Sequence, residues 1–174
     1  MKRIAALVLA LALFFSCTSA VQAGNTRETK GYIALTFDDG PSGEITQQLL
    51  DGLAQRNVHA TFFLCGYRIA QYPELAQRMA EDGHELGLSV IFWSVDPHDW
   101  DKDQSAQVLP YLLSHTQAGD IVLMHDLTEH SVSCALSFIG TMRAQGFEFC
   151  TVSELAALSG TSLSPGVYYN RFPH

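Results

Sequence analysis

The run from Tyr32 to Ser42, YIALTFDDGPS, constrains the fold of this chain more than any other. It begins as an apolar, β-prone stretch of strand length and ends in two adjacent carboxylates, Asp38 and Asp39, followed by the turn signal Gly-Pro. Neighbouring side chains on a strand point to opposite faces, so these carboxylates share one environment only if the strand ends there. A strand that stops at two acids and turns into a helix places them where α/β folds keep their active sites. For an isolated pair, a solvated Asp-Asp turn is the alternative.

The longer run Thr-Phe-Asp-Asp-Gly-Pro-Ser, residues 36–42, resembles the signature of the polysaccharide deacetylases. This family of metal-dependent enzymes includes chitin, chitooligosaccharide and peptidoglycan deacetylases. Three later runs resemble other parts of the family pattern, namely 61–63 (Thr-Phe-Phe), 96–100 (Asp-Pro-His-Asp-Trp) and 123–125 (Leu-Met-His). The resemblance extends from about Tyr32 to Leu158. It implies an α/β fold, an incomplete (β/α) barrel of the polysaccharide deacetylase (NodB) type.

Two distant parts of the family pattern are joined directly after Gly87. The run Gly83–Gly87 leads straight into Leu88–Asp96, which resembles a much later strand. In the family, a His-x-x-x-His element with two metal ligands and an Arg-x-Pro-Tyr-Gly-like loop lie between them. The missing part amounts to at least one strand–helix unit, about 30 residues or more. No His-x-x-x-His occurs anywhere in the chain.

The resemblance assigns roles to individual residues. Asp38 matches the general base and Asp39 matches the metal ligand, with zinc or a similar divalent metal implied as cofactor. His125 matches the general acid, and Asp99 matches the carboxylate that orients it. Trp100 is a candidate for substrate binding. The motifs each follow a strand, so we expect Asp38, Asp39, Asp99 and His125 to converge at one end of the fold.

The other histidines do not restore a metal site in this interpretation. His59 and His84 are interpreted as structural. His98 and His130 could reach the site, but their spacing does not support a ligand role. One aspartate is a poor site for a transition metal, because specificity needs a set of ligands in fixed geometry.

Composition narrows the class of protein. A length of 174 residues suggests one domain, and 47% hydrophobic residues suffice for a core. The net charge of −8 argues against nucleic-acid binding, which needs a basic face.

The first 23 residues have the pattern of a signal peptide. Lys2 and Arg3 precede an apolar run, 4–15, which is too short for a comfortable membrane span, and Val-Gln-Ala before Gly24 fits a cleavage site. We therefore expect an exported protein, either secreted, periplasmic or associated with the cell envelope, without a transmembrane segment in the mature chain. A lipoprotein modified at Cys17 ranks second, and an uncleaved anchor third.

The mature chain divides into three parts. Residues 24–31 are a short lead-in, 32–158 form the internally truncated deacetylase domain, and 159–174 are a loop-like tail. After cleavage three cysteines remain, so at most one intrachain disulfide can form. The pair to test first is Cys134 with Cys150, although small buried hydrophobic residues are the favoured interpretation.

Periodicity and turn signals predict the regular elements. Strands are expected at 32–37, 58–64, within 88–96, at 120–126 and at 147–152. Helices are expected at 44–56 after a Ser42 cap, from Pro73 to near Gly83, from Asp103 or Ser105 with a kink or shifted start at Pro110, at 132–145 before Gly146, and at 153–158 after a Ser153 cap.

Two function classes follow. The first is a deacetylase that removes N-acetyl groups, or O-acetyl groups, from peptidoglycan, chitin or a related N-acetylglucosamine polymer, hydrolysing a carbon–nitrogen bond in the N-acetyl case. The second is a catalytically inactive relic with an internal deletion, or a sugar-binding pseudoenzyme. The absent histidines favour the second for this chain, and the family pattern favours the first.

Overall fold

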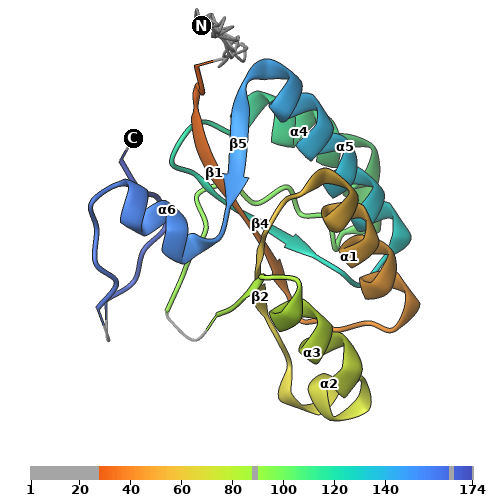
Figure 1. Cartoon of the computed structure of the whole chain (residues 1–174). Coiled ribbons are helices and arrows are strands. Elements are labelled where there is room, and N and C mark those ends of the chain that lie inside the picture. The colour runs from red at the N-terminus through yellow and green to blue at the C-terminus, as the bar shows by residue number, and fades with distance from the viewer. Residues whose placement is uncertain (1–27, 88–89, 165–166, 174) are drawn as a thin grey trace, which may run out of the picture.

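The computed structural model describes residues 28–87, 90–164 and 167–173, which form a parallel sheet flanked by helices (Figure 1). The strands are β1 (Gly31–Asp38), β2 (Thr61–Phe63), β3 (Glu85–Leu86), β4 (Ile121–His125) and β5 (Phe147–Cys150). The helices are α1 (Glu44–Arg56), α2 (Gly66–Gln71), α3 (Pro73–Glu81), α4 (Val108–His115), α5 (Glu129–Gln145) and α6 (Val152–Leu158), with a 3₁₀ turn η1 (Lys102–Gln107) before α4.

Strand β1 is the centre of the sheet. The strand order is β3-β2-β1-β4, and β5 also pairs with β1, always in parallel. The second half of β1 pairs with β2, while its first half pairs with β5. The sheet is therefore an open, incomplete barrel, as the sequence predicts, and the carboxyl ends of β1, β2 and β4 meet at one edge.

The alternation of side chains along β1 explains how the core and the site are separated. Ile33, Leu35 and Phe37 are fully buried against the layer formed by α1, α3, α4 and α5. The intervening positions face the other side, where Ala34 packs in a smaller cluster with α6 and Phe172 of the tail. Asp38 continues this second series of positions at the end of the strand.

Most predicted elements are present, with shorter strands than expected. The helices at 44–56 and from Pro73 and the strand at 120–126 are found almost to the residue, and Gly146 ends α5 in the left-handed conformation, φ 102°. The strand predicted at 58–64 is confined to 61–63. The edge of β1 beside residues 58–60 is already taken by β5, so those residues lack a pairing partner.

The strand expected within 88–96 does not form as a continuous element in the described part of the chain. Residues 91 and 95 make isolated bridges, to Tyr169 and Val122, while 88–89 lie outside the described residues. A strand persists only where a neighbour satisfies its backbone groups along its length. The segment nevertheless runs beside β4 and delivers Asp99 to the carboxyl end of that strand.

Two predicted caps are wrong. The residue that precedes α1 is Gly43, and no side chain caps this helix; the Ser42 amide instead donates to Thr46 Oγ1. Helix α6 is capped by Thr151 rather than Ser153, in a capping box with Glu154. Pro110 sits in the first turn of α4, where its missing amide proton costs nothing, so the helix starts later than Asp103 or Ser105 and is preceded by the 3₁₀ turn.

The three described cysteines are free, including the pair Cys134 and Cys150. These two thiols belong to different apolar clusters of the fold, Cys134 with the α1 and α5 layer and Cys150 with α6. They are therefore small buried side chains, which was the favoured interpretation.

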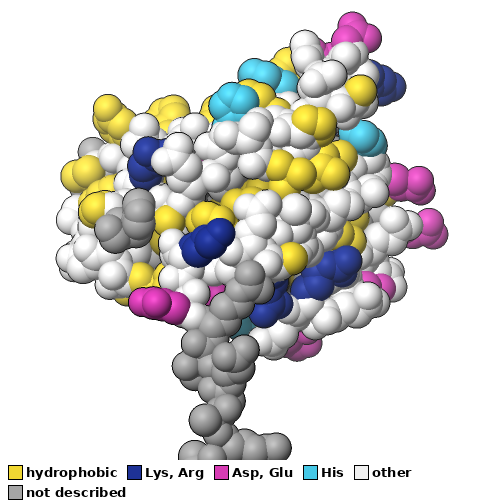
Figure 2. Space-filling model, turned by 90° about the horizontal axis from the view of Figure 1, so that it is seen from above, with side chains coloured by type: hydrophobic (Ala, Val, Ile, Leu, Met, Phe, Trp, Pro, Cys, Tyr) yellow, Lys and Arg dark blue, Asp and Glu magenta, His cyan; other side chains and the backbone are white. Residues whose placement is uncertain are grey.

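The predictions for the N-terminus concern residues outside those that the structure describes, namely the signal peptide 1–23, its cleavage before Gly24 and the alternative at Cys17. Within the part of the chain that the structure describes, none of the helices is both long and apolar enough to cross a membrane. The face of the molecule drawn in Figure 2 carries both basic and acidic side chains among hydrophobic and neutral ones.

Candidate active site

The two residues predicted as base and acid face each other across neighbouring strands. Asp38 is the last residue of β1 and His125 is the last residue of β4, and the two are direct partners in the parallel register. Residues in register on adjacent strands point to the same face of a sheet. Their side chains therefore converge at the carboxyl edge, and both are largely shielded from solvent.

Asp99 holds His125 with both carboxylate oxygens. Its Oδ1 lies 2.8 Å from His125 Nδ1, and its Oδ2 accepts the backbone amide of His125 at 2.9 Å. A carboxylate only accepts, so Nδ1 carries the proton and Nε2 is directed away from Asp99. The Asp99 side chain is fully buried, which fixes the imidazole in one orientation.

Charge around His125 favours its protonated form. Burial acts to lower the pKa of His125, but the hydrogen bond and charge of Asp99, together with the carboxylates of Asp38 and Asp39, outweigh burial and raise it. The imidazole is thus suited to donate a proton from Nε2 near neutral pH.

The pKa of Asp38 lies above that of an ordinary surface carboxyl. Burial, reinforced by the neighbouring carboxylates Asp39, Asp126 and Asp99 and opposed by His125, raises the pKa of Asp38 to about 6. Its Oδ1 atom is buried and has no hydrogen-bond partner among the described residues. A carboxylate that ionises near pH 6 is a stronger base than one at the usual value and is still charged at neutral pH.

This tuning predicts a stability effect. The folded-state pKa of Asp38 lies above its unfolded value of 3.8, so its ionisation opposes folding increasingly between pH 4 and pH 6 and fully above pH 6. Asp38→Asn should therefore stabilise the fold at pH 8. The expected gain is limited to about 1 kcal/mol, a rise in Tm of about 3 °C, because solvent still reaches part of the carboxyl. At pH 3.5 the two proteins should melt together. Asp39→Asn at the exposed neighbour is the matched control, and equal Tm differences at both pH values would contradict the prediction.

Asp39 leaves the strand in a turn. Its φ of 68° is left-handed, which aspartate tolerates better than most residues, and β1 ends before it. As a result Asp38 faces the site while Asp39 is exposed at its rim, with Cys65 Sγ 3.6 Å from its Oδ1. The expectation that the two acids lie at one end of the fold, with the strand stopping between them, holds in this geometry.

The residues around Asp39 do not fit a catalytic divalent metal. The described residues contain no group of three His, Cys, Asp or Glu side chains that could hold a metal ion, and the remaining sequence adds only Cys17 and His174 to those donors. The nearest extra donor, Cys65, is a poor ligand as a thiol, since desolvation and the Asp39 carboxylate raise its pKa. A zinc site needs three protein ligands in fixed geometry.

The other histidines are engaged elsewhere. His84 is buried and accepts the Ala60 amide at Nδ1, and burial together with His59 lowers its pKa to about 4. His130 Nε2 contacts the Ser105 carbonyl at 2.9 Å. His98 is exposed and pairs with Asp96 at 3.5 Å. These placements agree with structural roles for His59 and His84 and leave His98 and His130 without a link to Asp39.

Trp100 follows Asp99 directly and is 58% exposed, which leaves most of its indole free beside the site. The residue that sequence reasoning missed is Asp126, a fully buried carboxyl next to His125. The motif stops at the histidine, so only the contacts of Asp126 could reveal it.

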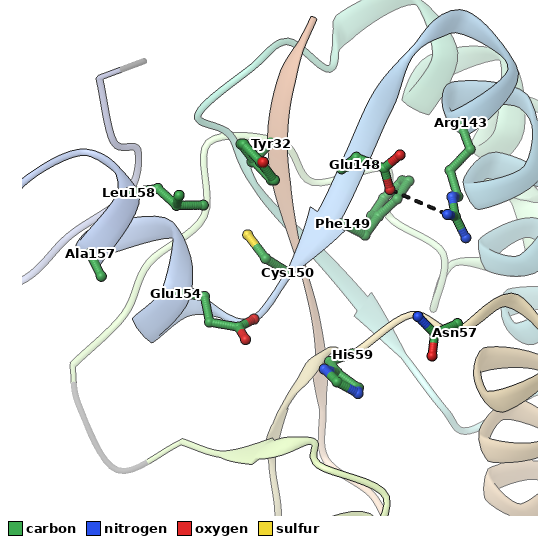
Figure 3. A pocket seen from close by; sticks show the side chains of 10 residues that line it. All are labelled: Tyr32, Asn57, His59, Arg143, Glu148, Phe149, Cys150, Glu154, Ala157 and Leu158. Carbon is green, nitrogen blue, oxygen red and sulfur yellow. Dashed lines mark ion pairs between the residues drawn. The ribbon is translucent and has the colours of Figure 1, made fainter. Parts of the chain in front are cut away.

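A pocket of about 630 Å³ lies away from this edge (Figure 3). It opens between β5, α6 and the loop before β2, and an ion pair of Arg143 with Glu148 spans one side at 3.4 Å. Asp38, Asp99 and His125 do not line it. The residues predicted as base and acid therefore lie at the strand ends and outside this pocket.

Fold and site together define an α/β protein with an open parallel sheet, at whose carboxyl edge Asp38 faces a histidine held by Asp99. A sequence model of the family described as polysaccharide deacetylase matches residues 25–118, more than half of the chain. This chain belongs to the polysaccharide deacetylase family.

Individual relatives agree with this membership. The chain is 30% identical to the peptidoglycan-N-acetylglucosamine deacetylase PgdA of Listeria monocytogenes, over 74% of this chain and 39% of that protein. It therefore spans about two fifths of the length of this relative. The structure of peptidoglycan deacetylase PdaC from Bacillus subtilis superimposes with a TM-score of 0.71 at 26% identity, covering 75% of this chain and 92% of that one. A family 4 acetyl xylan esterase from Clostridium thermocellum, solved with a cobalt ion, shares the fold with a TM-score of 0.75 at 24% identity, covering 82% and 100%.

The match to PgdA also includes positions that this chain lacks. It extends over 183 positions but uses 74% of the 174 residues here, about 129, which leaves about 54 positions of the relative without a counterpart. This total is large enough to include the strand–helix unit of about 30 residues or more that the motif order implies.

Proposed function

We propose that this chain is a polysaccharide deacetylase that removes N-acetyl groups from peptidoglycan, chitin or a related N-acetylglucosamine polymer. The observation that carries the proposal is the juxtaposition of Asp38 with a histidine that Asp99 holds by two hydrogen bonds. Family membership and relatives named for peptidoglycan deacetylation support it.

The arrangement supplies both proton transfers of amide hydrolysis. Asp38, ionised above pH 6, accepts a proton from the attacking water as its oxygen bonds to the acetyl carbon. His125, protonated, donates from Nε2 to the departing sugar nitrogen as the carbon–nitrogen bond breaks, which gives acetate and a free amine. Asp99 keeps the imidazole oriented and stabilises its charge. Since the donor set around Asp39 does not fit a metal, we assign no step to one.

The export and the localisation of the chain are part of the same proposal. A polymer of the cell envelope is met outside the cytoplasm, and the basic, apolar and small-residue pattern of residues 1–23 supports secretion with a mature start at Gly24. N-terminal sequencing of secreted material tests this, and a lipid-modified start at Cys17 would favour the lipoprotein alternative.

Acetate release tests the activity directly. The purified chain is incubated with chitooligosaccharides and with peptidoglycan, with and without added zinc, cobalt or nickel, beside Asp38→Asn as a matched control. Acetate above the level of the control supports the proposal. Sugar binding without any acetate above that level would overturn it in favour of a binding protein.

A further inference from the structure

A buried carboxyl beside the acid is left without a role by the proposed reaction. Asp126 follows His125 at the end of β4 and is completely buried. We propose that Asp126 is a positioning residue, which together with Thr46 ties the turn of residues 39–42 to the strand of His125 and so sets the spacing between base and acid. The inference rests on the proposed function of the site for its catalytic meaning, but its structural part stands on contacts alone.

The link runs through a hydroxyl whose direction is fixed. The Ser42 backbone amide donates to Thr46 Oγ1 at 2.6 Å, so this oxygen is the acceptor on that side. Thr46 Oγ1 in turn donates its own hydrogen to Asp126 Oδ2. Thr46 is completely buried, so water does not replace either partner. The turn, the first part of α1 and the end of β4 are thereby joined in one chain of hydrogen bonds.

Asp126 also presses directly on the turn. A β-carbon placed on Gly40 would come within 2.7 Å of Asp126 Cγ, so only a hydrogen atom fits between the carboxyl and this backbone. Gly40 is the second residue after Asp38 in the sequence. A shift of the carboxyl group would therefore shift the backbone that follows the base.

Other described contacts of the turn reach the other side of β1. The Asp39 amide donates to the Phe63 carbonyl at 3.1 Å, and the Gly40 carbonyl accepts from the Cys65 amide at 3.0 Å. Arg68 Nη1 lies 3.5 Å from the Pro41 carbonyl. These bonds connect the turn to β2 and α2. The hydrogen bonds through Thr46 connect it to the end of β4.

The burial of Asp126 is unfavourable in itself. Its Oδ1 atom has no partner among the described residues, and burial raises the pKa of this carboxyl despite the Thr46 hydrogen bond. An apolar side chain in this place would be better tolerated by the core. Core packing does not explain a carboxyl at position 126, but a defined contact with the turn does.

The test compares two buried threonine hydroxyls. Thr46→Val removes the hydrogen-bonded link and keeps the shape of the side chain, whereas Thr46→Ser keeps the hydroxyl. Thr36→Val is the matched control, because Thr36 Oγ1 donates to the Val122 carbonyl at 3.1 Å and not to the turn. Thr46→Val should shift the amide resonances of residues 39–42 and lower kcat for acetate release about 10- to 100-fold, with KM within twofold. Thr46→Ser should restore both. Thr36→Val should lower Tm and leave the turn resonances and kcat unchanged.

Two outcomes overturn the inference. If Thr46→Val lowers only Tm, as Thr36→Val does, the link is merely structural. If Asp126→Asn, whose amide oxygen still accepts from Thr46, perturbs the turn as strongly as Asp126→Leu, the carboxyl position is not transmitted by this hydrogen bond. The resonances need no turnover, so a chain that releases no acetate would fail the proposed function and still decide the positioning role.

Discussion

Insertion of the missing segment after Gly87 is expected to raise acetate release at least about 100-fold in the presence of zinc. The chain as it stands supplies Asp38, Asp99 and His125 for proton transfer, but the residues around Asp39 do not form a metal site. An amide carbonyl and an unactivated water are poor reaction partners, and a bound divalent metal contributes several kcal/mol by polarising one and acidifying the other. The insert is a strand–helix segment of about 30 residues or more that carries the His-x-x-x-His element and the Arg-x-Pro-Tyr-Gly-like loop, as the motif order of the family implies.

A matched control separates metal binding from repair of the fold. The same insert with both histidines of its His-x-x-x-His element changed to alanine should recover the sheet without recovering the rate. Zinc content measured by mass spectrometry should approach one ion per chain only with the histidines present. An unmodified chain that holds one zinc, lost on Asp39→Ala, and already matches the repaired rate would contradict the prediction.

His125→Ala is expected to lower acetate release by about 10²–10⁴-fold, the usual contribution of a general acid. Asp99→Asn should cost nearly as much, because both oxygens of Asp99 hold this histidine and its charge raises the pKa of the imidazole. The double variant should be little worse than either single one, since the two residues act as a unit. These losses are measured in the chain that carries the inserted segment after Gly87.

The pH dependence of kcat/KM gives a second measurement of the pair formed by His125 and Asp99. Removing the charge of Asp99 lowers the pKa of His125, so the protonated form is lost at lower pH and the alkaline limb of kcat/KM moves in the same direction. Asp96→Asn is the control, because Asp96 contacts the exposed His98 and not His125. If Asp99→Asn leaves both the rate and the limb unchanged, His125 does not act through Asp99.

The convergence of the predicted site residues at one edge of the sheet could be expected from the sequence because these residues follow strands. Each of Asp38, Asp99 and His125 comes at or just beyond the end of an apolar extended run, and parallel strands bring such ends to one edge. Helix 44–56 was predictable for a related reason, since its apolar stripe and its limits are local properties of the chain.

Features that depend on partners far away in sequence were not predictable. The shortness of β2 follows from β5 occupying the adjacent edge, and the loss of a strand within 88–96 follows from the lack of neighbours along its length. The cap of α6 shifted to Thr151 because β5 ends at Cys150, two residues before the predicted end of the strand. Asp126 escaped notice because burial, not residue type, makes it important.

The position of β1 also determines when the chain can fold. The second half of β1 pairs with β2 nearby in sequence, but Gly31 pairs with Phe147 and Ala34 pairs with Ile121, so β1 gains its neighbours β4 and β5 only after most of the chain has been synthesised. Contacts this distant in sequence slow folding, because long loops must close before the pairing is rewarded. A nascent chain would remain unfolded for longer than a helical protein of the same length. The export proposed from residues 1–23 would use this delay, because a translocation channel admits an extended chain and not a folded one.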